Sequence, residues 1–120
     1  KYVYMKSGLK DKPIYNMTLM PTLMRGFISP EAIDQATFVN GGKYSHGHKV
    51  LQIPSGPFIP LKEPYPDAVY DLTKDPKQEH NSINEDLQKA LDAKLKTAML
   101  KAGAPSWQME RMGFETCKEK

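Results

Sequence analysis

The sequence has 120 residues, of which 39% are hydrophobic and 26% are charged. This length and composition predict one globular domain and exclude a disordered chain. No apolar run approaches the roughly 18 residues of a transmembrane helix, so no membrane association is expected. The net charge is +3, and the only arginines are Arg25 and Arg111. Nucleic-acid readers depend on arginine forks and clustered basic residues, so no nucleic acid is expected as a partner.

A single cysteine, Cys117, excludes an internal disulfide and a cysteine-built metal site. It lies in a polar tail, residues 115–120, where no structured basic pocket would activate a thiolate. The chain opens at Lys1, directly in a strand-like segment and without a visible signal peptide. This opening suggests a piece of a longer protein.

The first third of the chain predicts two strands and a short helix. Residues 1–6 and 14–20 are rich in β-formers, and the Gly, Asp and Pro residues between them favour a hairpin of these two strands. Ser29 is a suitable helix cap, and Pro30 is tolerated at the first helical position. The helix is expected to run to about residue 37.

The rest of the chain predicts a strand at residues 50–53, an extended loop over 54–66 with five prolines, and a strand at 68–72. A long helix is expected to end at residue 102, and a short one to run over 105–112. This order predicts an α+β fold, in which a small antiparallel sheet of about four strands packs against the C-terminal helix, with a loop-rich middle.

The long helix has the clearest signals. Ser82 and Glu85 fit a capping box, in which the side chain of each residue accepts a hydrogen bond from the backbone amide of the other. Glu85 with Lys89, and Asp92 with a lysine four residues later, favour the helix further. Gly103 is expected to end it. The predicted inner face consists of Ile83, Leu87, Ala90, Leu91, Leu95, Ala98 and Ala102.

Residues 43–49 are the best local candidate for a binding site, because they hold two histidines, two lysines, a tyrosine and a serine. Lys43, His46 and His48 can donate hydrogen bonds to sulfate, phosphate or carboxylate oxygens. The alternative interpretation is a solvated polar loop. No metal is expected in this chain, because His-x-His supplies only two ligands and the third histidine, His80, lies in a distant turn.

No catalytic residue is expected in this chain. The sequence has no nucleophile elbow and no glycine-rich phosphate-binding loop. Asp71 and Asp75 flank a strand end and are interpreted as turn-forming residues.

Four segments together resemble the sulfatases of the alkaline-phosphatase superfamily. Residues 69–81, VYDLTKDPKQEHN, resemble the LYDLxxDPxExxNL stretch near the C-terminus of these enzymes. Residues 103–114, GAPSWQMERMGF, are similar to the GAPxEQxxRLG ending of many bacterial sulfatases. Residues 1–4 look like the strand that precedes this region, and residues 15–22 resemble a bacterial subgroup. The resemblance implies that residues 1–114 are a sulfatase C-terminal subdomain.

The match departs from the family pattern at three places. Trp107 stands where Glu is common, and Asn81 is followed by Ser82 instead of Leu. The family nucleophile lies in a C/S-x-P-x-R motif, whose Cys or Ser becomes formylglycine. Cys117 is followed by Lys-Glu-Lys and does not match. The resemblance therefore implies that formylglycine and the calcium ion belong to an N-terminal catalytic domain outside this chain.

The family reaction is sulfate-ester hydrolysis, in which calcium neutralises the sulfate oxygens as a Lewis acid. The resemblance implies that this chain is the non-catalytic part of such a sulfuric ester hydrolase and is inactive alone. It would complete the fold and wall the substrate pocket. Lys43, His46 and His48 would then contact a sulfated carbohydrate or an aryl sulfate, and the sequence does not distinguish these substrates.

The expected partner is the N-terminal catalytic domain of the same protein. Its docking surface should remain as an apolar patch, through which the chain alone could dimerise. The resemblance favours the bacterial periplasm or secretion and leaves the cytoplasm open. Two other interpretations are a stand-alone binding module for sulfated or acidic glycans and an interaction domain of unrelated origin.

Overall fold

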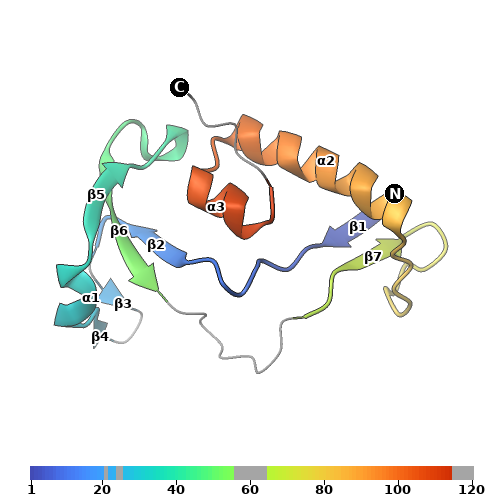
Figure 1. Cartoon of the computed structure of the whole chain (residues 1–120), viewed down its shortest axis with the longest axis horizontal. Coiled ribbons are helices and arrows are strands. Elements are labelled where there is room, and N and C mark those ends of the chain that lie inside the picture. The colour runs from blue at the N-terminus through green and yellow to red at the C-terminus, as the bar shows by residue number, and fades with distance from the viewer. Residues whose placement is uncertain (21, 24–25, 56–64, 115–120) are drawn as a thin grey trace. The chain divides into compact units, whose positions relative to one another are not determined.

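The structure is a computed structural model that describes residues 1–20, 22–23, 26–55 and 65–114 (Figure 1). It confirms the predicted α+β class, with small antiparallel sheets and a helix-rich C-terminal part. No helix in these ranges is long and apolar enough to cross a bilayer. Most of the predicted proline-rich loop, and the polar tail with Cys117, lie outside the described residues.

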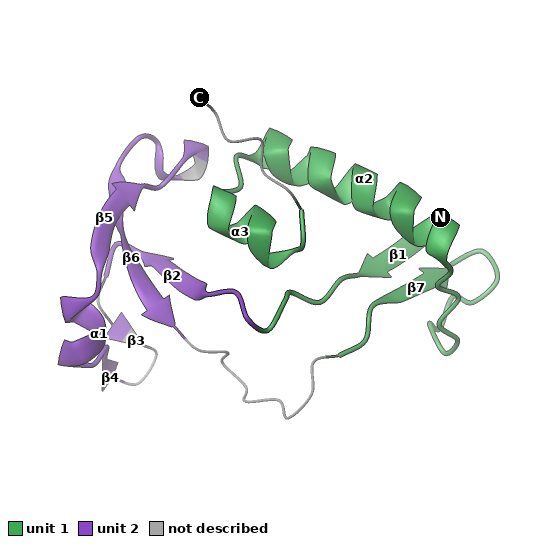
Figure 2. Ribbon diagram, viewed as in Figure 1, with its two compact units in different colours: residues 1–10, 62–120 green, residues 11–61 purple. Residues whose placement is uncertain are grey.

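The chain forms two compact units (Figure 2). Unit 1 comprises Lys1–Lys10 and Lys62–Lys120, and unit 2 comprises Asp11–Leu61. The strands are divided between them. Unit 1 has a two-stranded sheet, and unit 2 has a three-stranded sheet and a very short pair.

In unit 1, β1 (Tyr2–Met5) pairs antiparallel with β7 (Ala68–Asp71). The predicted hairpin of the first two strands is therefore wrong, because each of them pairs with a strand far away in the sequence. Val69 of β7 is completely buried, at 0% exposure. A turn signal in the sequence favours a local hairpin, but it carries no information on such a distant partner.

The helices α2 (Glu85–Ala102) and α3 (Ser106–Arg111) complete unit 1. Both were predicted, and Gly103 ends α2 in the left-handed conformation, with φ +79°, as expected. Met109 of α3 is 1% exposed, which makes it a main contributor to this core. The backbone amide of Leu9 donates to the carbonyl of Arg111 at 2.7 Å, so α3 is fixed to the segment after β1.

The start of α2 differs from the predicted capping box. Asn84 is the N-cap, and its Oδ1 accepts from the amide of Leu87 at 2.9 Å. Ser82 instead donates its amide and its hydroxyl to the carbonyl of Val69, at 2.8 and 3.0 Å. Ser82 is thus committed to the free edge of β7, and the capping role passes to the next suitable side chain. The predicted pair of Glu85 and Lys89 is present, with 2.7 Å between Oε1 and Nζ.

The inner face of α2 agrees with the prediction in part. Leu87, Leu91 and Leu95 are half-buried, but Ala90 and Ala98 are exposed. Ala102 is half-buried as predicted, and the half-buried positions also include the polar residues Gln88, Asp92 and Lys96. An apolar pattern alone misplaces this face, because part of the contact between α2 and its surroundings consists of hydrogen bonds.

In unit 2, β2 (Ile14–Thr18), β6 (Lys49–Ser55) and β5 (Thr37–Asn40) form an antiparallel sheet in the order β2-β6-β5. Ile53 and Val50 of β6 are 1% and 7% exposed and form its core. Of these strands, β5 was not predicted. The helix expected to run to residue 37 ends at Asp34, and the β-formers after it pair with β6 instead.

The remaining elements of unit 2 are small. The strands β3 (Thr22–Leu23) and β4 (Gly26–Phe27) pair with each other, and α1 (Pro30–Asp34) follows. As predicted, Ser29 caps α1, with its Oγ accepting from the amide of Ala32 at 3.3 Å. A 3-10 turn, η1 (Lys43–Ser45), lies between β5 and β6.

Candidate functional site

The predicted anion-binding residues lie on the connection between β5 and β6, residues 41–48, which we call the histidine loop. Ser45 organises it. Its hydroxyl lies 2.9 Å from the carbonyl oxygens of both Gly42 and His48, and its own carbonyl accepts from the amide of His48 at 3.0 Å. The amide of Gly42 donates to Oδ1 of Asn40. The loop is therefore closed by its own hydrogen bonds.

The backbone of the histidine loop also restricts which residues it can contain. Gly42, His46 and Gly47 have positive φ angles of 72°, 51° and 82°. Gly41 has no room for a side chain, because an added Cβ would lie 2.6 Å from Cβ and Oγ of Ser45 and 2.9 Å from Cγ1 of Val50. The backbone of the loop thus requires glycine at these positions near the histidines, whether or not a ligand binds.

The structure places the three candidate side chains on this one loop. Lys43 lies in η1, His46 follows it in the left-handed region, and His48 precedes β6. All three are exposed. Three donors on one exposed loop can bind an anion, and a solvated polar loop would present them in the same way. Their role in substrate binding therefore stays a prediction.

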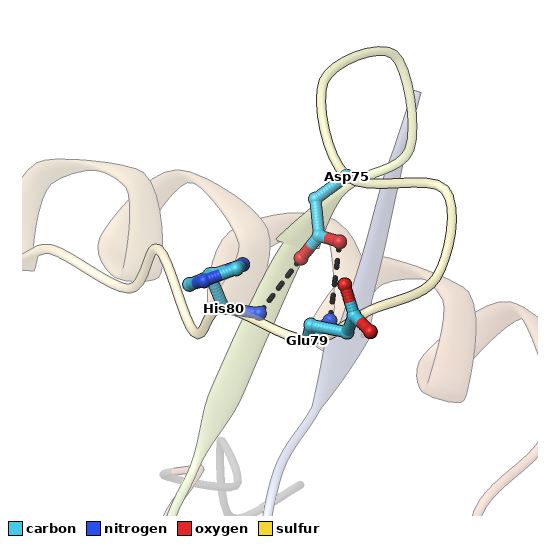
Figure 3. Close-up of side chains that lie close together, drawn as sticks. All are labelled: Asp75, Glu79 and His80. Atoms are coloured by element: carbon cyan, nitrogen blue, oxygen red, sulfur yellow. Dashed lines mark hydrogen bonds between the residues drawn. The ribbon is translucent and has the colours of Figure 1, made fainter.

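A second group of candidate ligands lies in the turn after β7, and Figure 3 shows its side chains. Asp75, Glu79 and His80 each present one ligand atom, and these atoms all lie within 4.8 Å of one another. The carboxylate of Asp75 accepts from the backbone amides of Glu79 and His80, at 3.1 and 2.8 Å. These bonds to the His80 and Glu79 amides lower the pKa of Asp75.

The interpretation of Asp71 and Asp75 as turn-forming residues agrees with this geometry. Oδ1 of Asp71 accepts from the amide and the hydroxyl of Thr73, at 3.0 and 2.6 Å, and the pKa of Asp71 is lowered by these bonds. The carbonyl of Asp71 also accepts from the amide of Asp75 at 2.7 Å. Sequence reasoning did not connect Asp75 with His80. The sequence signal for this group was an aspartate followed, four and five positions later in the same turn, by a glutamate and a histidine.

A third polar cluster in unit 1 links β1 to α2. Nζ of Lys6 lies 3.2 Å from both carboxylate oxygens of Asp92 and 3.7 Å from Oδ2 of Asp67. Gln88 donates to the same Oδ2 of Asp67 at 3.0 Å. Nζ of Lys6 also lies 5.6 Å from the centroid of the Phe114 ring. Lys6 is only 14% exposed, so the cluster is a structural connection rather than an open site.

Sequence reasoning missed this cluster. Asp92 was expected to pair with a lysine on its own helix, whereas its carboxylate faces Tyr4 and Lys6. Two patterns could have indicated it. Tyr4 and Lys6 alternate along a strand and so share a face, and Gln88 and Asp92 are four residues apart on a helix and so share a side.

Comparison of the chain with family models, with curated proteins and with solved structures finds no match.

Proposed function

We propose that this chain is the C-terminal, non-catalytic part of a bacterial sulfatase, and that it completes the fold and walls the substrate pocket. The observation that carries the proposal is where the sulfatase-like segments meet. Residues 1–4, 69–81 and 103–114 are far apart in the sequence, and all three belong to unit 1. The fourth segment, residues 15–22, belongs to unit 2.

The contacts within unit 1 support the proposal because they join these segments to one another. Tyr4 of the first segment lies opposite Val69 of the second in the β1–β7 register. Asn81, at the end of the second segment, accepts from the amide of Val69 at 3.0 Å and so closes the turn onto β7. Lys6, just after the first segment, stacks over Phe114 at the end of the third.

The roles of the aspartates in the DLxxDP phrase also support a non-catalytic part. The side chains of Asp71 and Asp75 bond backbone amides of their own turn. Such bonds shape the turn, and they require no substrate. A subdomain that supports a separate catalytic centre would contain a turn-forming motif of this kind.

In this proposal the substrate is a sulfate ester, either a sulfated carbohydrate or an aryl sulfate. The histidine loop would bind a part of the substrate away from the sulfur, through Lys43, His46 and His48. Formylglycine and calcium would be held by the N-terminal catalytic domain, which is also the main partner of this chain.

The test begins with the reading frame upstream of the codon for Lys1. We expect it to encode a C/S-x-P-x-R motif. The product of the whole reading frame, made together with a formylglycine-generating enzyme, should hydrolyse a chromogenic aryl sulfate, and replacing the Cys or Ser of that motif by Ala should abolish turnover. Residues 1–120 alone should be inactive, with or without calcium. Absence of the motif, or turnover by the isolated chain, would contradict the proposal.

A further inference from the structure

We infer that the turn of residues 75–80 binds a divalent transition metal ion, best matched by zinc, through Asp75, Glu79 and His80. Their ligand atoms already lie within 4.8 Å of one another (Figure 3). They come from three different side chains, two that offer carboxylate oxygens and one that offers an imidazole nitrogen. This combination is typical of zinc and related metals in proteins.

The backbone brings these ligands together before any metal binds. The two carboxylate oxygens of Asp75 each accept one amide, Oδ1 from Glu79 and Oδ2 from His80. These two bonds fold the chain back, so that the side chains of positions 79 and 80 start beside the Asp75 carboxylate. A carboxylate oxygen has two lone-pair sites, so each oxygen of Asp75 keeps one site for a metal.

The other two ligands are available. In the described part of the chain, the side chains of Glu79 and His80 take part in no hydrogen bond or ion pair, and both residues are exposed. Metal binding would therefore leave the two backbone hydrogen bonds of this turn intact. The ligand atoms lie within 4.8 Å of one another, and rotation of exposed side chains can bring them to the roughly 3.5 Å that tetrahedral ligands with bonds of about 2.1 Å require.

The imidazole decides which metal fits. Carboxylate oxygens alone suit calcium and magnesium, whereas an added imidazole nitrogen shifts the preference to zinc and its neighbours. The two ionised carboxylates of Asp75 and Glu79 balance the charge of a divalent ion. Three protein ligands leave the fourth tetrahedral position for a water molecule, because the turn is exposed.

The test must separate this turn from the histidine loop, since His46 and His48 could bind zinc as a pair. We therefore use the full chain with His46→Gln and His48→Gln as the reference protein. Titration calorimetry with zinc chloride should show one ion bound per chain. His80→Gln and Glu79→Gln should each weaken binding by about tenfold or more, since even loss of an outer partner of a metal ligand costs about 10- to 100-fold.

The matched control is Lys77→Gln, which changes an exposed side chain of the same turn and should leave the zinc affinity unchanged. Because neither Glu79 nor His80 uses its side chain in the fold, both variants should keep the circular dichroism spectrum of the reference protein. The imidazole resonances of His80 should shift when zinc is added. Three results would overturn the inference: no zinc binding in the reference protein, equal affinity after His80→Gln, or calcium binding as tight as zinc binding.

Discussion

The hydroxyl of Tyr4 donates a 2.7 Å hydrogen bond to Oδ1 of Asp92, and this bond joins β1 to α2 across 88 positions of the sequence. Burial and the Asp92 carboxylate raise the pKa of Tyr4 from 10.0 to about 12. The folded protein therefore holds the neutral phenol more strongly than the unfolded chain does. The stability that this provides is fully present below pH 10 and is lost as the pH rises toward 12.

The first prediction concerns Tyr4→Phe. Removal of a partly exposed hydrogen bond to a carboxylate should lower the free energy of unfolding by about 1 kcal/mol at neutral pH. The variant should also lose less stability than the wild type between pH 10 and pH 12. Spectrophotometric titration of tyrosinate should show the Tyr4 step at about pH 12 in the wild type, and this step should be lost in the variant. The matched control, Tyr2→Phe on the exposed end of β1, should keep this late-titrating tyrosine.

The second prediction concerns Asn81, whose Oδ1 accepts from the amide of the fully buried Val69. Asn81→Ala leaves that amide without its acceptor, so the free energy of unfolding should fall by about 1–3 kcal/mol in urea denaturation. Asn81→Asp keeps the acceptor and should cost less. Equal losses for the two variants would mean that the oxygen of Asn81 does not matter.

The third prediction concerns the histidine loop. Gly41→Ala should force the loop apart, because the new Cβ would lie 2.6 Å from Cβ of Ser45. We expect a loss of about 1–3 kcal/mol in unit 2, measured as faster amide hydrogen exchange of the β6 core residues Val50 and Ile53. Gly26→Ala is the control, because an added Cβ there has no neighbour within 4 Å. Similar exchange in both variants would contradict the crowding at Gly41.

The sequence was sufficient to predict the elements that carry strong local signals. The helix α2 has an apolar pattern, acidic residues in its first turn and a terminal glycine, and these do not depend on the rest of the fold. Strand β5 is different. It has four residues between a capped helix and a glycine turn, and only its pairing with β6 makes it a strand. Short segments of this kind are decided by tertiary contacts.

The choice between two similar signals also depends on the fold. Ser82 and Asn84 are both good helix caps, and the sequence favoured Ser82 because Glu85 completes a capping box. The structure uses Asn84, because Ser82 bonds the carbonyl of Val69 on β7. The position of strand β7 therefore decides which cap is used. Its residue Val69 lies 13 positions before Ser82 in the sequence.

The candidate sites also differ in how far the sequence alone could predict them, because some depend on the fold and others do not. Lys43, His46 and His48 could be grouped from the sequence because six consecutive residues contain them. Asp75 and His80 lie within a span of the same length, but only the fold of the turn shows that their ligand atoms approach each other. The contact of Lys6 with Asp92 spans 86 positions, so it depends entirely on how α2 lies against β1.

The last prediction rests on the proposed function and concerns His48 in the product of the whole reading frame. If the exposed histidine loop binds a part of the substrate away from the sulfur, His48→Ala should weaken binding and leave the chemical step intact. Each hydrogen bond from a charged donor contributes about 1.5–3 kcal/mol, which corresponds to about a 10- to 150-fold lower kcat/KM on a large sulfated carbohydrate. A small aryl sulfate reaches less of the pocket and should lose much less. Kinetics of His48→Ala on both esters, with Lys77→Ala as the control in a different turn, would decide between the two interpretations. Near-wild-type rates on both esters would leave the histidine loop as solvated surface.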